Sequence, residues 1–261
     1  MSEILTERSG GILRVTVNRP AKKNAMTSDM YRGLAKAFAD AGKDESIRVV
    51  LWDAAGDSFS AGNDVKDFLD NPPEGDSSPQ GLLFDALINL DKPLIAAVQG
   101  VAVGGGTTLL THCDFVYAGE SAKFKLPFVD LALVPEFGSS WGLAARIGYV
   151  RAAELFMLGK FFDAKHAAEI GLVTRVVPDE QLLATATETA EQLAAKPPGA
   201  LQAMKKLLKR SAREAIEPAA HAETEEFDAR VRAPEAKEAF TAFIEKRAPD
   251  FTKAKGQATA K

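Results

Sequence analysis

The chain of 261 residues has one cysteine, three histidines and no strong excess of charge of either sign. A single cysteine excludes a disulfide framework and a cysteine-rich metal site. None of the histidines stands in a spacing typical of zinc ligands, so we expect no metal. A formal net charge of −4 gives no indication of a nucleic-acid partner. We expect Cys113 to be a small core residue. The histidines are expected at the surface or at helix ends: His112, His166 and His221.

Long apolar runs are also missing, and the first residues lack the charged-then-apolar pattern of a signal peptide. The sequence therefore predicts neither a membrane span nor a membrane partner, and we expect a cytoplasmic location. What the chain does have is 46% apolar residues, over a length that can bury a large core. This composition is typical of a globular, enzyme-sized protein.

Strand and helix patterns alternate in the first half of the chain. Short apolar or alternating segments predict strands, at residues 12–17, 49–52, 94–98 and 115–117. Thr27 is a candidate cap for a helix whose apolar residues recur at helical spacing: Met30, Leu34 and Phe38. A second helix is expected over 82–90. The segment 71–79 is rich in Pro, Gly, Ser and Asp, so we expect a mobile loop there.

Helical patterns dominate after about residue 138, with one further strand expected at 173–177. Asp163 is a candidate cap for a helix that Gly171 would end. The prolines of this region are each expected near the first turn of a helix: Pro178, Pro197, Pro198, Pro218 and Pro234. We expect the tail after Phe251 to be frayed. Strand–helix units followed by a helical region predict an α/β core with a helical appendage.

Three consecutive glycines, at 104–106, follow the apolar residues 101–103. Without a Cβ, the backbone there can approach a ligand closely and can adopt positive φ at little cost. A helix that begins at this point would turn its free N–H groups toward the same space. One carboxylate, Glu136, then follows between Pro135 and Phe137 and is a candidate proton carrier. An anion-stabilising loop with one acid–base carboxylate suggests enolate chemistry on an activated carbonyl compound.

Both features have competing interpretations. A glycine run is by itself often a turn or a packing device, and Glu136 could simply open a helix that starts at Gly138. The segment 138–142 also matches the G-x-S-x-G nucleophile elbow around Ser140, and Asp163 and His221 follow in hydrolase order. An elbow needs a strand that runs straight into the serine, whereas Pro135 interrupts the approach. The sequence therefore favours enolate chemistry over a serine hydrolase.

Taken together, a set of ordered segments between about residue 11 and residue 251 resembles the crotonase superfamily, the fold of enoyl-CoA hydratases and isomerases. No single segment is decisive, but the ordered set is specific. The segments are Asn18-Arg19-Pro20 with Asn24-Ala25, Phe59-Ser60-Ala61-Gly62-Asn63-Asp64, Ala97-Val98-Gln99-Gly100-Val101-Ala102-Val103-Gly104-Gly105-Gly106, Cys113-Asp114, Ala167-Ala168-Glu169-Ile170-Gly171-Leu172-Val173 and Phe243-Ile244-Glu245-Lys246-Arg247.

The resemblance implies an α/β fold of the ClpP/crotonase type, a spiral of ββα units with a C-terminal helical trimerisation region. The spiral core would comprise residues 1–197 and the helical region residues 198–261. The protein would form a homotrimer or a dimer of trimers. Its substrate would be an acyl-CoA thioester, with coenzyme A entering as part of the substrate and no further cofactor.

The resemblance also assigns roles by motif position. The backbone N–H groups of Asn63 and Gly105 would form an oxyanion hole for the thioester. Seven other matched positions contact CoA in the family. Asp64 and its neighbours would lie near the adenine. Phe243 and Lys246 would reach CoA from the C-terminal helix, often that of a neighbouring subunit. The seven positions are Lys22, Lys23, Ala61, Asp64, Val65, Phe243 and Lys246.

Departures from the family pattern indicate the reaction. Hydratases of the family carry two glutamates, at positions that are Thr108 and Phe128 in this chain. Threonine and phenylalanine can neither activate water nor protonate a carbon. The surroundings of Glu136 resemble the Δ3,Δ2-enoyl-CoA isomerase branch, in which one glutamate acts alone. An apolar pocket beside Phe137 and Trp141 should raise the pKa of that base.

The predicted function is therefore an enoyl-CoA isomerase that moves a β,γ double bond to the α,β position through a dienolate. Two alternatives stay open. One is an enoyl-CoA hydratase or another dienolate-forming enzyme of the family that uses Glu136 or Asp130. The other is a non-catalytic homologue that binds acyl-CoA.

Overall fold

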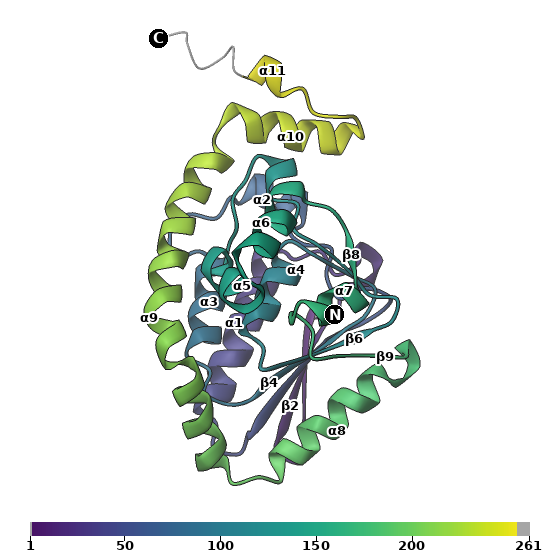
Figure 1. The fold of residues 1–261 in the computed structure, drawn as a ribbon, viewed down its shortest axis with the longest axis vertical. Coiled ribbons are helices and arrows are strands. Elements are labelled where there is room, and N and C mark those ends of the chain that lie inside the picture. The colour runs from purple at the N-terminus through teal and green to yellow at the C-terminus, as the bar shows by residue number, and fades with distance from the viewer. Residues whose placement is uncertain (1, 255–261) are drawn as a thin grey trace.

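The computed structural model describes residues 2–254 and contains two β-sheets surrounded by helices (Figure 1). The larger sheet has the strand order β1-β2-β3-β4-β6-β9, and the smaller has the order β5-β7-β8. Apart from the antiparallel pair β1–β2, all neighbours in the larger sheet are parallel. The strands are β1 (Ile4–Ser9), β2 (Ile12–Val17), β3 (Val49–Ala54), β4 (Leu94–Val98), β5 (Val101–Val103), β6 (Phe115–Gly119), β7 (Lys123–Lys125), β8 (Phe162–Asp163) and β9 (Arg175–Val177).

The chain advances as a spiral because it visits the larger sheet and then a second layer in each turn. β4 continues into β5, and β6 continues into β7, with β5 and β7 paired in parallel. Two isolated bridges extend this second layer backward, from Ser60 to Ala102 and from Asn63 to Met26. Segments far apart in the sequence therefore lie side by side. This topology confirms the predicted α/β crotonase fold.

Helices cover both faces of the larger sheet. On one face, α1 and α3 pack together over a core that includes Trp52. On the other face, α8 covers a smaller apolar cluster around Leu51 and Ile95. The α-helices are α1 (Ser28–Lys43), α2 (Val65–Asp70), α3 (Pro79–Ile88), α4 (Gly105–Thr108), α5 (Ser139–Ile147), α6 (Tyr149–Leu158), α7 (Ala164–Glu169), α8 (Leu182–Ala194), α9 (Pro198–Val231), α10 (Pro234–Glu245) and α11 (Phe251–Ala254). Short 3₁₀ helices are η1 (Pro20–Lys22), η2 (Leu109–His112), η3 (Val129–Leu131) and η4 (Asp179–Gln181).

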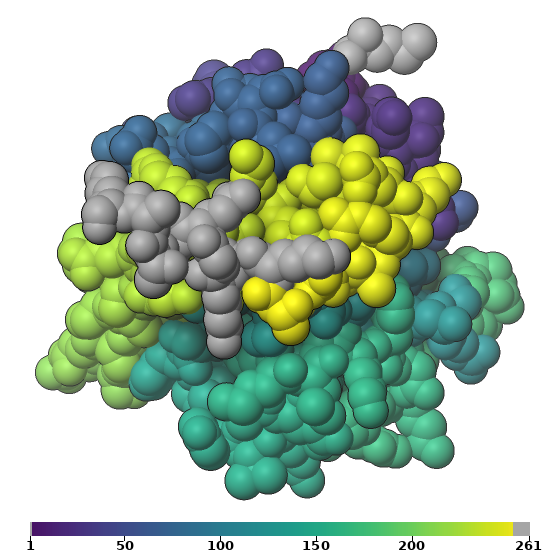
Figure 2. Space-filling model, turned by 90° about the horizontal axis from the view of Figure 1, so that it is seen from above, coloured from purple at the N-terminus to yellow at the C-terminus, as the bar shows by residue number. Residues whose placement is uncertain are grey.

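The C-terminal helices wrap around the spiral. The long helix α9 runs along one side of the molecule and packs against α5, and α10 crosses one end (Figure 1). Figure 2 shows the yellow C-terminal segment lying across that end, between blue residues of the first half and teal residues of the middle of the chain. α9 begins next to the boundary that was predicted at residue 197. The division into two parts stays a prediction.

Most predicted elements are confirmed, and the differences have physical reasons. β1 escaped the sequence patterns because it is an edge strand whose residues are nearly all exposed. The helix expected at 82–90 begins earlier, since Ser78 caps it and Pro79 fits its first turn. The strand expected at 173–177 starts at Arg175. The predicted tail after Phe251 starts as α11, and its remainder lies outside the described residues.

Pro218 contradicts the expectation that every late proline lies near the start of a helix. It lies inside α9, more than five turns from Pro198. A proline in a helix interior removes one backbone hydrogen bond and crowds the preceding turn. Packing of α9 along α5, with Ile216 against Gly138, fixes this part of the helix in place. Tertiary contacts therefore outweigh the local preference.

The predicted cap of α1 is confirmed, because the Thr27 hydroxyl accepts a hydrogen bond from the Met30 backbone N–H at 3.3 Å. Replacing Thr27 by Ala should lower the free energy of unfolding by about 1 kcal/mol, the usual cost of losing an N-cap. Urea unfolding followed by circular dichroism measures the change. Thr27→Ser keeps the oxygen and should recover most of the loss, whereas equal stability of the Ala variant and the wild type would contradict the capping role.

No helix within residues 2–254 is long and apolar enough to cross a membrane.

Candidate active site

The glycine run forms a tight turn between β5 and α4. Gly104 has a φ of 55° in the left-handed region, and its N–H donates to the Lys125 carbonyl of the neighbouring strand. Gly105 is the first residue of α4. A Cβ on Gly106 would lie 2.9 Å from the Ser60 side chain, so the two segments touch. The backbone therefore reaches this point only because the side chains are absent.

Asn63 follows the second-layer segment of the preceding turn of the spiral. That segment pairs with β5 through hydrogen bonds in both directions between Ser60 and residues Val101 and Val103. Within the part of the chain that the structure describes, neither the Asn63 nor the Gly105 backbone N–H donates to another group. These are the two donors that motif position assigned to the oxyanion hole. Their role stays a prediction.

Glu136 lies directly against the glycine run. A Cβ built on Gly105 would be 3.0 Å from Glu136 Oε1, so the carboxyl leaves no free space for a side chain at Gly105. Oε1 is shielded from solvent and has no hydrogen-bond partner among the described residues. Burial raises the pKa of Glu136 to about 8, and the nearby charge of Glu223 adds to the increase. The predicted rise in its pKa is confirmed.

Tyr31 connects the two halves of the site. This residue of α1 is buried, and its hydroxyl donates to Asn63 Oδ1 at 2.6 Å. The same hydroxyl would lie 3.1 Å from a Cβ on Gly105. Burial, together with the charge of Glu136, holds the pKa of Tyr31 well above its ordinary value. The neutral hydroxyl thus orients the Asn63 side chain and lies close enough to Glu136 to sense its charge.

The turn that carries Glu136 is strained. Phe137 has a φ of 62° and Gly138 a φ of 68°, so two successive residues are left-handed. For a bulky residue such as Phe137 this conformation costs about 1–3 kcal/mol. The Phe137 carbonyl accepts a hydrogen bond from His112 Nε2 at 2.8 Å. Since a carbonyl only accepts, Nε2 of His112 carries the proton.

Glu223 of α9 holds the other side of this turn. Its Oε2 accepts the Gly138 N–H and its Oε1 accepts the Ser140 N–H, both at 2.7 Å. The carboxylate therefore lies at the start of α5, where an anion is stabilised. Glu223, and not Glu136, supplies the acid at the start of this helix. The competing interpretation of Glu136 as a helix-opening residue is therefore wrong.

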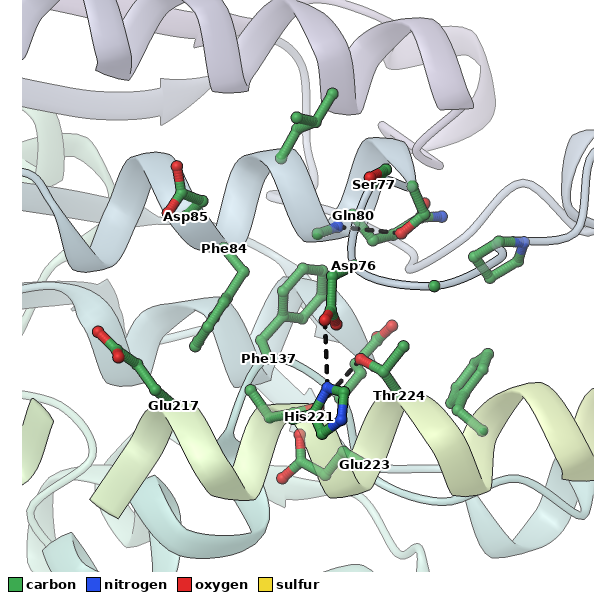
Figure 3. A pocket seen from close by; sticks show the side chains of 18 of the residues that line it. Asp76, Ser77, Gln80, Phe84, Asp85, Phe137, Glu217, His221, Glu223 and Thr224 are labelled. Atoms are coloured by element: carbon green, nitrogen blue, oxygen red, sulfur yellow. Dashed lines mark hydrogen bonds and ion pairs between the residues drawn. The ribbon is translucent and has the colours of Figure 1, made fainter. Parts of the chain in front are cut away.

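A cavity of about 610 Å³ adjoins Glu136 (Figure 3). Its lining comes from the segment 73–89, the turn at 135–137 and α9. In Figure 3, the Phe137 and Phe84 side chains extend toward the space between α3 and α9. Trp141, expected beside the base, is not among the residues that line the cavity. The cavity gives a bound molecule access to Glu136 from the α9 side.

Across the cavity, polar contacts join α9 to the loop before α3. His221 Nδ1 and Asp76 Oδ2 are 3.1 Å apart (Figure 3). The Gly75 N–H donates to Asp228 Oδ2, and Arg232 pairs with Glu74, each at 3.1 Å. Residues 71–78 form the predicted loop.

The first group of predicted CoA-contacting residues gathers at one place. Lys22 and Lys23 are exposed in and after η1, and the Lys23 carbonyl accepts the Ala61 N–H at 2.9 Å. Asp64 caps α2, of which Val65 is the first residue. Asp64 Oδ2 also pairs with Arg19 at 2.7 Å. Both carboxylate oxygens of Asp64 thus have partners within the protein. Its predicted place near the adenine stays a prediction.

The second group lies on α10. Phe243 is 60% exposed near the end of this helix, and Lys246 closes it in a left-handed conformation. α10 packs against α2 through Phe240, whose ring centroid is 5.5 Å from that of Phe68. The helix that carries the second group therefore contacts α2, the helix that Asp64 caps. Contact of Phe243 and Lys246 with CoA stays a prediction.

The positions of the two missing acids are filled with structural residues. Thr108 is buried, and its hydroxyl donates to the Gly104 carbonyl at 3.4 Å. Phe128 is buried against Phe156. Asp130, the alternative base, forms an ion pair with Lys125 at 2.9 Å and is half exposed. None of these three side chains lines the cavity beside Glu136.

The serine hydrolase interpretation is wrong. Ser140 lies in the first turn of α5, and no strand runs into it. Asp163 caps α7 by accepting the His166 N–H at 2.8 Å, and His221 pairs with Asp76. The three residues therefore do not form a triad.

The histidine expectations are partly corrected. His166 and His221 are exposed, as predicted. His112 is buried, contrary to the expectation, and its ring Nε2 donates a hydrogen bond to the Phe137 carbonyl. Burial lowers the pKa of His112 to about 3. Cys113 is confirmed as a core residue. No group of three or more His, Cys, Asp or Glu residues between 2 and 254 is arranged to hold a metal ion.

The sequence patterns missed Tyr31, His112 and Glu223 as parts of the site. A usable signal existed for Glu223, because it lies at helical spacing between Ala220 and Phe227, both buried. An acid on the apolar face of a helix needs a polar partner, and here the partners are backbone N–H groups 83 and 85 residues earlier in the chain. Sequence spacing could not identify those partners.

Comparisons with known proteins agree with this architecture. The family profile described as enoyl-CoA hydratase/isomerase matches residues 7–255. "Enoyl-CoA hydratase EchA19" of Mycobacterium tuberculosis is 40% identical, covering 95% of this chain and 96% of the relative. "Enoyl-CoA delta isomerase 2" of Rattus norvegicus is 34% identical, covering 85% of this chain and 57% of the relative. A crystal structure of an enoyl-CoA hydratase/isomerase from Pseudoalteromonas atlantica has a TM-score of 0.92 at 37% identity, covering 96% of this chain and 100% of that chain.

Names of hydratases predominate among the relatives, and isomerases occur beside them. The profile covers nearly the whole chain, and the solved structure has the same fold. The chain belongs to the enoyl-CoA hydratase/isomerase family, within the crotonase superfamily.

Proposed function

We propose that this enzyme is an enoyl-CoA isomerase that converts a 3-enoyl-CoA into the conjugated 2-trans-enoyl-CoA. One observation carries the proposal: Glu136 Oε1 is a buried carboxyl oxygen without a partner, beside Gly105, and the acid positions of the hydratases are Thr108 and Phe128. A β,γ-unsaturated thioester needs only one group to move a proton between two carbons. The likeness to an enoyl-CoA delta isomerase also supports it.

In the proposed mechanism, the Glu136 carboxylate removes a proton from the α-carbon of the thioester. The electron pair of that C–H bond forms a double bond between the α-carbon and the thioester carbonyl carbon, and the π electrons of the carbonyl move to the thioester oxygen. With the β,γ double bond still in place, the product of this step is a dienolate. The N–H groups of Asn63 and Gly105 would stabilise that oxygen at about 3 Å. The carboxyl then returns the proton to the γ-carbon, where the electrons of the β,γ double bond form the new C–H bond. The thioester carbonyl is restored at the same time, and the double bond comes to lie between the α- and β-carbons. No second acid and no cofactor takes part.

The pKa of Glu136 suits this reaction. A carboxyl with a pKa of about 8 is a stronger base than an ordinary glutamate, and it holds the transferred proton while the dienolate exists. Because Oε1 is shielded from water, the proton should return to the substrate faster than it exchanges with solvent.

This gives a direct test on the wild-type enzyme. Incubated with 3-enoyl-CoA deuterated at the α-carbon, it should form 2-enoyl-CoA and place part of the deuterium on the γ-carbon, as measured by mass spectrometry and NMR. The same enzyme should add water to 2-enoyl-CoA at a much lower rate. Rapid hydration would contradict the isomerase proposal, and complete loss of the label to water would contradict the single shielded base.

A hydratase is the second candidate, since hydratase names predominate among the relatives and Glu223 is a second carboxylate on the cavity wall. Both oxygens of Glu223 already accept backbone N–H groups, which stabilise its ionised form. Burial raises the pKa of Glu223 and these hydrogen bonds oppose the rise, so its oxygens are engaged in holding the turn rather than in carrying a proton. A non-catalytic acyl-CoA-binding protein would turn over neither substrate in the experiment above.

We also propose that the enzyme assembles as a homotrimer or a dimer of trimers. Large apolar side chains that are more than half exposed on α6 and α9 support an association of copies. They are Tyr149, Val150, Met157, Leu158, Met204, Leu207 and Leu208. In such an assembly, Phe243 and Lys246 would be available to the CoA of a neighbouring subunit.

A further inference from the structure

We propose that Glu223 is a positioning residue for Glu136: it holds the strained turn that carries Glu136 and acts on the Glu136 carboxyl through its own negative charge. This inference rests on the proposed function only for its kinetic consequence. It adds a residue from α9, more than 80 residues away, to the machinery around the base.

The geometry of the turn supports the positioning role. Phe137 keeps its left-handed conformation only while neighbouring groups fix it, whereas Gly138 adopts the same conformation at little cost. Glu223 accepts the N–H groups of Gly138 and Ser140, and it is only 7% exposed. A Cβ on Gly138 would lie 2.5 Å from Ile216, so α9 passes too close for another residue. α9 thus determines where the Glu136 side chain points.

The hydrogen bonds decide which carboxyl of the pair keeps a proton. Two N–H donors stabilise the ionised form of Glu223, whereas the buried oxygen of Glu136 has none. Two carboxylates that share one site cannot both ionise easily, so the pair titrates in separate steps. Burial raises the pKa of both carboxyls, but hydrogen bonds act against that rise only at Glu223. The proton therefore resides on Glu136 near neutral pH, and Glu223 remains an acceptor.

Other charges do not oppose this effect at close range. From α1, the neutral Tyr31 faces Glu136, and from α4 only the Gly105 backbone does. From η2, His112 contacts the Phe137 carbonyl, and its low pKa keeps it uncharged. The remaining charged or titratable groups of the cavity lie at its exposed or partly exposed rim: Asp76, Asp85, Arg213, Glu217, His221 and Asp228.

The test compares Glu223→Gln with Glu223→Asp. For the wild type, kcat/KM should rise with pH and level off above about 8, because the free enzyme needs ionised Glu136. In Glu223→Gln the negative charge is lost, so the midpoint should move about one unit toward lower pH. In Glu223→Asp the charge remains but the shorter side chain loosens the turn, so the plateau should fall while the midpoint stays.

A matched control is Glu214→Gln, on the exposed face of the same helix, which should leave both midpoint and plateau unchanged. Thermal unfolding establishes that each variant is folded. If Glu223→Gln does not fold, Glu223→Ala removes the same negative charge and takes its place, and its midpoint should also move toward lower pH. A purely structural role would lower the plateau in both variants and move neither midpoint, which would overturn the proposal.

An infrared titration separates this inference from the proposed function, because it needs no substrate. The carbonyl band of protonated Glu136, identified by its absence in Glu136→Gln, should disappear near pH 8 in the wild type and at lower pH in Glu223→Gln. That shift in a protein without isomerase activity would refute the proposed function alone. Isomerase activity with an unshifted band would refute the role of Glu223 alone.

Discussion

Glu136→Gln should lower kcat for 3-enoyl-CoA by about 10⁴-fold, because the amide has the shape of the carboxyl but cannot accept a proton. KM should change little, since the amide occupies the same space as the carboxyl. The measurement is the formation of the conjugated thioester, followed by its absorbance. The control is Asp130→Asn, which removes the alternative carboxylate from its exposed pair with Lys125 and should retain wild-type activity.

Activity that survives Glu136→Gln but falls in Asp130→Asn would show that Asp130 is the base.

The free energy of unfolding tests whether Glu136→Gln is inactive because it is misfolded. We expect this variant to be more stable than the wild type at high pH, although it is inactive. The pKa of Glu136 is about 8 in the folded protein, against about 4.5 in the unfolded chain. The folded state therefore binds more protons between these values, and the wild type loses stability as pH rises through this window.

Glu136→Gln lacks the titrating group, so its free energy of unfolding should exceed that of the wild type at pH 9, with the difference vanishing below about pH 4.5. Denaturant unfolding at several pH values measures this. If Glu136→Gln is inactive but more stable than the wild type at high pH, the basic carboxylate of Glu136 destabilises the fold while it enables the reaction.

The sequence predicted the parts of the site that depend on local backbone chemistry. The glycine run requires a turn that side chains would block, and Glu136 follows Pro135 and stands two residues before Gly138, so both features could be recognised. The strands followed from short apolar segments, and the cap of α1 from Thr27. What these features share is that their causes lie within a few residues of each other.

The rest depends on contacts between distant segments. Glu223 binds a turn more than 80 residues earlier, and His112 is buried because the Phe137 carbonyl needs a donor. Pro218 stays within α9 because the helix packs along α5. In each case a local preference for the surface or for a helix start is overruled by a partner that only the fold brings near.

Gly105→Ala tests the contact between the glycine run and the side chains that the fold brings against it. The φ of Gly105 is not left-handed, so alanine introduces crowding without backbone strain. The new Cβ would lie 3.0 Å from Glu136 Oε1, 3.1 Å from the Tyr31 hydroxyl and 3.3 Å from the Phe137 ring. These separations are shorter than ordinary van der Waals contacts, so the carboxyl or the α4 backbone has to move.

Either movement should lower kcat/KM by about 10²–10³-fold, because it separates the base from the substrate or withdraws an oxyanion donor. Gly199→Ala is the matched control: a Cβ there meets nothing within 4 Å, in the first turn of α9, and activity should be unchanged. The infrared band of Glu136 distinguishes the two movements, since only displacement of the carboxyl alters its titration. Wild-type kcat/KM in Gly105→Ala would show that the thioester oxygen and the base lie elsewhere, because a site built on this contact cannot accept the added methyl group without loss.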